Sequence, residues 1–146
     1  MQRVDYYVLP ASDPEARPLF LCRLCDRVLN AGSRLHIHCV DEASADHISQ
    51  LLWEHKPEAF LPHSKAEGES EDSAPITLGW DAMRPQHRDA FVNLALALPE
   101  DAFSFDRVLE IVVQEPAVLE ATRSNYRQYV AQGITPNMHD MRKGSR

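Results

Sequence analysis

The sequence predicts an α/β protein, a three-layer α/β/α sandwich around a largely parallel central sheet, in which mixed strand pairing stays open. Short apolar segments typical of buried strands alternate along the chain with longer segments that have helical spacing. Two of the strand segments, 91–96 and 107–113, are nearly continuous apolar runs, as in strands covered on both faces. With 146 residues, 44% of them hydrophobic, residues 1–146 are expected to form a single domain.

The first half of the chain predicts a β-α-β-α order. The four elements are expected, in this order, at residues 4–9, 12–30, 34–40 and 41–53. Ser12 and Glu15 have the spacing of a capping box, and Gly32 is placed to end the same helix. Asp41 is expected to cap the second helix.

The second half begins with a segment, 54–74, that contains helix-stopping prolines and a predicted acidic loop at 67–73. The elements expected after it are strands at 75–80, 91–96 and 107–113 and a helix from Pro116 to Gly133. Residues 135–146 are predicted to form a flexible C-terminal tail.

The formal net charge of −7 argues against a protein that mainly binds nucleic-acid phosphates, because such binding needs a basic surface. Residues 121–146 nevertheless hold five cations and one acid, a net charge of +4, against −11 for the first 120 residues. This asymmetry predicts a local anion-binding end on an acidic protein. The sequence contains neither a run of about 20 apolar residues nor a signal peptide, so we expect a cytoplasmic protein with no membrane association.

Signatures of catalysis or cofactor binding are not found in the sequence. The five glycines lack the spacing of a dinucleotide or P-loop turn, and we expect no cofactor. Cys22 and Cys25 have the spacing of a redox pair, but they lie within a predicted helix, which favours packing in the core. His36 and His38 share one face of a strand, where hydrogen-bonded polar positions are favoured over metal ligands. Residues 87–89, His-Arg-Asp, are predicted to form a surface turn.

A tryptophan outside the inward stripe of its helix marks the first candidate docking surface. Aliphatic residues between 48 and 52 form that stripe, so Trp53 is expected to be partly exposed. Phe60 and Pro62 follow it, and the three side chains are predicted to form an apolar patch of the kind that anchors protein interfaces. The alternative, in which Trp53 and Phe60 seal the edge of the sheet, stays open.

The last predicted helix carries a second candidate surface. Arg123, Tyr126, Arg127 and Val130 are spaced to share one helical face. Two guanidiniums beside a phenol and an aliphatic group suit an acidic peptide, because arginine binds carboxylates bidentately. The alternative is a solvated amphipathic face whose arginines pair with neighbours such as Glu120.

Seven short segments together carry a resemblance that no single one would establish. In order, they are DYYVL (5–9), RLHIHCVDE (34–42), LLW (51–53), FLPH (60–63), API (74–76), NL (93–94) and YRQY (126–129). In this order, and in a chain of this length, the sequence resembles the DNA polymerase III chi subunit family.

The resemblance implies a non-catalytic accessory subunit, associated with the clamp loader of the bacterial replicative polymerase at replication forks. It implies two partners, the psi subunit and the acidic, Phe-ending C-terminal tail of single-stranded-DNA-binding protein, with DNA contacted only indirectly. An iron–sulfur repair helicase is implied as an alternative partner for the psi-facing surface. By motif, the psi-facing positions are Trp53 and Phe60, beside Pro62, and the tail-binding positions are Arg123, Tyr126 and Arg127.

A small α/β hydrolase that depends on a metal or a nucleotide is the competing hypothesis. Such an enzyme needs convergent polar groups at the carboxyl edge of the sheet. The sequence offers only His36, His38, Asp41 and Glu42 there.

Overall fold

The computed structural model describes residues 3–55, 63–65, 75–85 and 87–142. Within these residues, seven strands form one sheet in the order β3-β4-β2-β5-β6-β1-β7, and every neighbouring pair is parallel. The strands are β1 (Arg3–Val8), β2 (Leu35–Cys39), β3 (His63–Lys65), β4 (Ile76–Trp80), β5 (Ala90–Asn93), β6 (Arg107–Val112) and β7 (Asn137–Asp140). The helices are α1 (Ala16–Asn30), α2 (Glu42–His55), the 3-10 helix η1 (Glu100–Ser104) and α3 (Pro116–Ala131).

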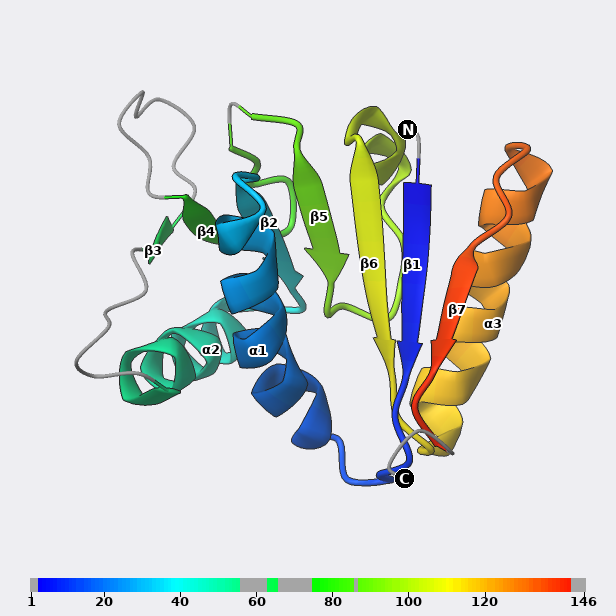
Figure 1. The fold of residues 1–146 in the computed structure, drawn as a ribbon, viewed down its shortest axis with the longest axis horizontal. Coiled ribbons are helices and arrows are strands. Elements are labelled where there is room, and N and C mark those ends of the chain that lie inside the picture. Colours follow the sequence, from blue (N-terminus) through cyan, green and yellow to red (C-terminus); the bar gives the residue numbers. More distant parts are fainter. Residues whose placement is uncertain (1–2, 56–62, 66–74, 86, 143–146) are drawn as a thin grey trace.

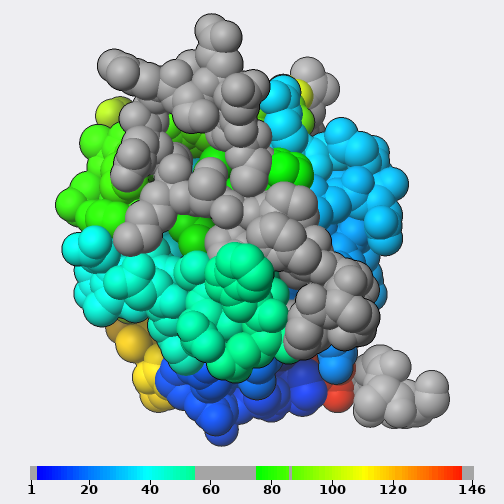
Figure 2. Space-filling model, turned by 90° about the vertical axis from the view of Figure 1, so that its left-hand side faces the viewer, coloured from blue at the N-terminus to red at the C-terminus, as the bar shows by residue number. Residues whose placement is uncertain are grey.

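The helices cover both faces of the sheet, which confirms the predicted three-layer sandwich (Figure 1). Helices α1 and α2 lie on one face, and α3 lies on the other, beside β6, β1 and β7. Figure 2, which views the molecule from the β3 and β4 side, shows α2 (cyan to green) at the surface. Alternate residues of β1 serve the two cores: Tyr7 packs with α1, whereas Val4, Tyr6 and Val8 pack on the α3 side.

For α1 and α2, the helix-end signals agree with the sequence prediction at Gly32 and Asp41 and differ at the start of α1. Gly32 has φ +82° and follows α1, and Asp41 accepts a hydrogen bond of 2.8 Å from the Ser44 N–H at the start of α2. The prediction of a capping box at Ser12 and Glu15 is wrong, because α1 begins only at Ala16 and Glu15 makes no side-chain capping bond. Asp13 instead stabilises the turn before α1, since its Oδ1 accepts a hydrogen bond of 3.0 Å from the Glu15 N–H.

Three strand predictions need correction. The strand expected at 91–96 ends at Asn93, because the Leu94 and Ala95 N–H groups both turn to the His38 carbonyl, at 2.9 and 3.2 Å. Strand β3 lies in the segment that was expected to be a loop. Strand β7 occupies part of the expected flexible tail and pairs with β1. The predicted acidic loop at 67–73 lies outside the described residues.

Candidate binding site

Helix α3 presents the side chains that the sequence predicted as a docking face. Its first turn contains Pro116, and the Glu115 side chain accepts a hydrogen bond of 3.0 Å from the Val118 N–H. The buried positions of the helix are Val118, Thr122, Asn125 and Tyr129. This stripe faces the sheet, and Arg123 and Arg127 lie outside it and are exposed.

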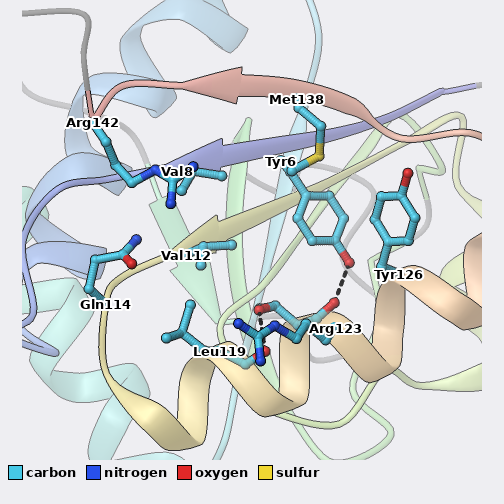
Figure 3. Close-up of a pocket in the computed structure, with 10 residues that line it drawn as sticks. Tyr6, Val8, Val112, Gln114, Leu119, Arg123, Tyr126, Met138 and Arg142 are labelled. Atoms are coloured by element: carbon cyan, nitrogen blue, oxygen red, sulfur yellow. Dashed lines mark hydrogen bonds between the residues drawn. The ribbon is translucent and has the colours of Figure 1, made fainter.

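A pocket of about 200 Å³ lies between α3 and the strands β1, β6 and β7 (Figure 3). Its mainly apolar lining comprises Tyr6, Val8, Val112, Leu119, Tyr126 and Met138, and its polar lining comprises Gln114, Thr122, Arg123 and Arg142. The lining residues Val8 and Val112 are the last residues of β1 and β6, so the pocket extends to the carboxyl ends of these strands, where α/β proteins commonly bind their ligands. It therefore combines an apolar interior with two guanidinium groups.

Tyr6 fixes α3 against the sheet from beneath the pocket. Its hydroxyl donates a hydrogen bond of 2.8 Å to the Thr122 carbonyl, and its ring meets Tyr126 edge to face at 5.8 Å. Burial raises the pKa of Tyr6, with smaller contributions from Glu110 and Tyr126, so the phenol stays neutral at ordinary pH. The pocket floor is thus a rigid, uncharged aromatic surface.

Only some of the residues predicted for this face line the pocket. Arg123 and Tyr126 line the pocket, whereas Arg127 is exposed on the same helix but is not among the lining residues. Within the part of the chain that the structure describes, neither arginine makes an ion pair, so the alternative of pairing with Glu120 is not observed.

Apart from Arg123 and Tyr126, the lining residues were not predicted as site residues from the sequence, and Gln114, Met138 and Arg142 are among them. The basic charge of residues 121–146 was a signal for Arg142. Its position, however, depends on the pairing of β7 with β1, which no local pattern indicates. Gln114 follows β6, and its amide donates to the Leu9 carbonyl at 3.0 Å.

A buried carboxyl group lies behind α3. Glu110 is completely buried, and its Oε2 accepts hydrogen bonds from Tyr129 Oη at 2.7 Å, Asn125 Nδ2 at 3.3 Å and Asn93 Nδ2 at 3.4 Å. Burial raises the pKa of Glu110 to about 7, although these donors and the charge of Arg17 oppose the shift. The sequence signal was a single acid within the apolar run 108–113, and it was missed.

A second buried carboxylate joins three strands. Asp5 in β1 accepts from Arg107 Nε of β6 at 2.7 Å, contacts Arg3 Nε at 2.9 Å and lies 2.9 Å from His139 Nε2 of β7. Burial acts to raise the pKa of Asp5, but the bonds from His139 and Arg107 outweigh it and lower the pKa. This cluster attaches β7, and with it one wall of the pocket, to the sheet.

Trp53 lies on α2, away from the pocket, and 55% of its surface is exposed, which confirms the predicted exposure. Its neighbours Ala45, Ile48 and Leu52 are buried against the sheet. Phe60 and Pro62 lie outside the described residues. The predicted three-residue patch therefore stays a prediction.

The cysteines lie as the sequence indicated. Cys22 and Cys25 are buried in the core on the α1 side, which confirms their packing role. Burial raises the pKa of Cys22 to about 11 and raises that of Cys25 as well, so both thiols are protonated at neutral pH.

The histidines lie partly as predicted. His36 is buried and its Nδ1 lies 2.8 Å from Thr77 Oγ1, so its interpretation as a hydrogen-bonded position is confirmed. The predicted surface turn at 87–89 is wrong for His87, which is buried with its ring edge to face against Phe105 at 6.2 Å. Among the described residues, no group of three His, Cys, Asp or Glu side chains is arranged to hold a metal ion.

The fold and the pocket together define a parallel α/β protein with an arginine-lined apolar pocket on one side of its sheet. The sequence model of the family described as DNA polymerase III chi subunit, HolC, matches residues 1–137.

Three similar proteins carry the name DNA polymerase III subunit chi. The one from Pseudomonas aeruginosa is 43% identical over 139 residues, covering 95% of this chain and 96% of that protein. The one from Haemophilus influenzae is 28% identical over 130 residues, covering 88% and 90%. The one from Escherichia coli is 27% identical over 118 residues, covering 80% of each.

The chain belongs to the DNA polymerase III chi subunit family. Among the described helices, none is both long and apolar enough to cross a membrane.

Proposed function

We propose that this protein is a non-catalytic accessory subunit of the bacterial replicative DNA polymerase III, located in the cytoplasm at replication forks. In this role it joins the psi subunit of the clamp loader to the C-terminal tail of single-stranded-DNA-binding protein and contacts DNA only indirectly. Membership of the chi subunit family supports the assignment to the polymerase. The observation that carries the tail-binding assignment is the apolar pocket flanked by Arg123 and Arg142.

The chemistry of the pocket matches an acidic peptide that ends in phenylalanine. Tyr126, Met138 and Leu119 offer apolar contacts for the aromatic ring. Arg123, with Arg127 one helical turn further on, offers guanidiniums for the terminal carboxylate and for acidic side chains before it. A peptide held this way needs both contacts, because exposed ion pairs alone contribute little free energy in water.

The psi subunit is assigned to the opposite side of the molecule, at Trp53, together with Phe60 and Pro62. A half-exposed tryptophan on a well-packed helix is the type of side chain that dominates binding energy at interfaces. An iron–sulfur repair helicase is the alternative partner for this surface.

The polar groups at the carboxyl edge of the sheet support a binding protein rather than a hydrolase. The His36 ring is buried beside Thr77, and Asp41 uses its carboxylate to cap α2. Neither is therefore available to act on a substrate in the open part of the edge.

Charge reversal on α3 tests the proposed function. Arg123→Glu and Arg127→Glu should each weaken binding of a synthetic tail peptide by about tenfold or more, because a carboxylate then faces a carboxylate. Titration calorimetry at low and high salt measures this loss, and the affinity of the parent protein should also fall as salt is added. Binding of the psi subunit and the thermal midpoint should stay unchanged, since both arginines are exposed.

Arg23→Glu is the matched control, because Arg23 is also exposed but lies on α1, across the sheet. It changes the net charge by the same amount. Equal tail binding by the parent and both α3 variants would refute the assignment of this face.

A further inference from the structure

The last residue of β7, Asp140, lies beside Arg142, which lines the pocket two residues further on. Arg142 Nε donates to Asp140 Oδ1 at 2.9 Å, and its Nη2 donates to Oδ2 at 2.7 Å. The Arg142 N–H also donates to Asp140 Oδ1 at 3.0 Å. The Met141 N–H donates to the Val8 carbonyl at 2.8 Å, so this short segment is fixed to the end of β1.

Arg142 and Arg123 reach the pocket from different elements (Figure 3). Arg142 lies near Val8 and Gln114, whereas Arg123 comes from α3 on the other side. Their electrostatic states differ: Arg142 is engaged by a carboxylate of the same chain, and Arg123 has no such partner among the described residues.

The Arg142–Asp140 pair is easily exchanged. The two side chains are 51% and 42% exposed, and ion pairs at such positions stabilise a protein by little. A ligand carboxylate can offer the guanidinium the same bidentate geometry that Asp140 now provides. Replacing one carboxylate by the other therefore conserves the number of strong hydrogen bonds.

We infer that Asp140 is an internal competitor for the peptide-binding guanidinium of Arg142. An acidic peptide that enters the pocket takes over Arg142 through a carboxylate, and Asp140 gives up its hydrogen bonds to the guanidinium. The inference rests on the proposed function for its occupant, and it adds a residue and a mechanism that limits affinity. The protein therefore binds its peptide less tightly than its two pocket arginines would allow.

A double-mutant cycle separates competition from general charge repulsion. Asp140→Asn should tighten binding of an acidic, Phe-ending synthetic peptide by about threefold, because Arg142 becomes available. Arg142→Ala should weaken binding by about fivefold. In the Arg142→Ala background, Asp140→Asn should have a much smaller effect, since the guanidinium for which Asp140 competes is gone.

Asp106→Asn is the matched control, because it removes one exposed carboxylate before β6, remote from the pocket-forming end of that strand. Its affinity should equal that of the parent. The inference is overturned if Asp140→Asn and Asp106→Asn bind alike, or if Asp140→Asn tightens binding equally with and without Arg142. If the parent binds the peptide and depends on Arg123, either result leaves the proposed function standing. If the parent does not bind the peptide at all, both the inference about Asp140 and the proposed function fail.

Discussion

The Tyr129 hydroxyl donates a hydrogen bond of 2.7 Å to Glu110 Oε2, and both side chains are buried between α3 and β6. This bond ties the helix that carries the candidate peptide-binding face to a central strand. Because Glu110 is a carboxylic acid, its protonation state affects how firmly the two elements are held together.

Glu110→Gln should change the pH dependence of stability. The Glu110 pKa is raised to about 7 by burial, above the value of 4.5 for an unperturbed group. Between these values the folded protein holds a proton that the unfolded chain has lost, so this group lowers the free energy of unfolding as pH rises through 7. Glutamine keeps the acceptor for Tyr129 but cannot ionise.

Urea unfolding of both proteins at pH 5 and pH 8 measures the effect. Relative to the parent, Glu110→Gln should gain about 3 kcal/mol between the two pH values. An offset between variant and parent that is the same at both pH values would show that Glu110 does not titrate in this range.

The buried histidines predict the opposite trend in acid. Burial, aided by the charge of Arg84, lowers the pKa of His36 to about 3 and that of His38 to about 4, from 6.5. The unfolded chain therefore takes up protons that the folded protein excludes, and stability should fall as pH drops from 6.5 towards 4. His38→Phe, which can keep the stacking on Phe91, should reduce this loss. Urea unfolding at pH 7 and 4.5 is the measurement, and an unchanged acid slope in the variant would contradict the assignment.

Trp53→Ala should weaken binding of the psi subunit, or of the helicase, by about 2 kcal/mol or more if Trp53 anchors the interface. The thermal midpoint should change little, since more than half of the side chain is already exposed. Leu19→Ala on α1 is a suitable control, because Leu19 is exposed to the same degree, at 54%. Pull-down and calorimetry with purified partners report the loss. The prediction fails if Trp53→Ala melts the isolated protein while its folded fraction binds normally.

Local patterns in the sequence were sufficient for most of the fold. Helical spacing and the caps at Gly32 and Asp41 defined α1 and α2, and the apolar runs defined β1, β2, β4 and β6. Strand β7 could not be found this way, because its sequence NMHD has no apolar run and none of its residues is buried. An edge strand of this kind is held by contacts with β1 that are remote in the sequence.

The candidate site was predictable to the extent that it lies on one helix. Arg123 and Tyr126 share a face of α3 through helical periodicity alone. Arg142 and Met138 reach the pocket only through the pairing of β7 with β1. Glu110 stands out as a buried, hydrogen-bonded carboxyl group only once the fold brings its donors from β5 and α3 around it. Such relationships depend on tertiary structure, which single-sequence periodicity does not contain.

The contact between Asp5 and His139 depends on the register of β7 against β1. In the observed register, Tyr7 lies beside His139 and Tyr6 beside Met138. His139 therefore stacks on Tyr7 at 4.6 Å and reaches Asp5 on one face, while Met138 enters the pocket on the other. A slip of one residue would exchange the two faces, leaving a buried carboxylate without its histidine and a pocket without its methionine. One hydrogen-bonding contact on the α1 side, between His139 and Asp5, thus favours the strand alignment that completes the binding pocket on the α3 side.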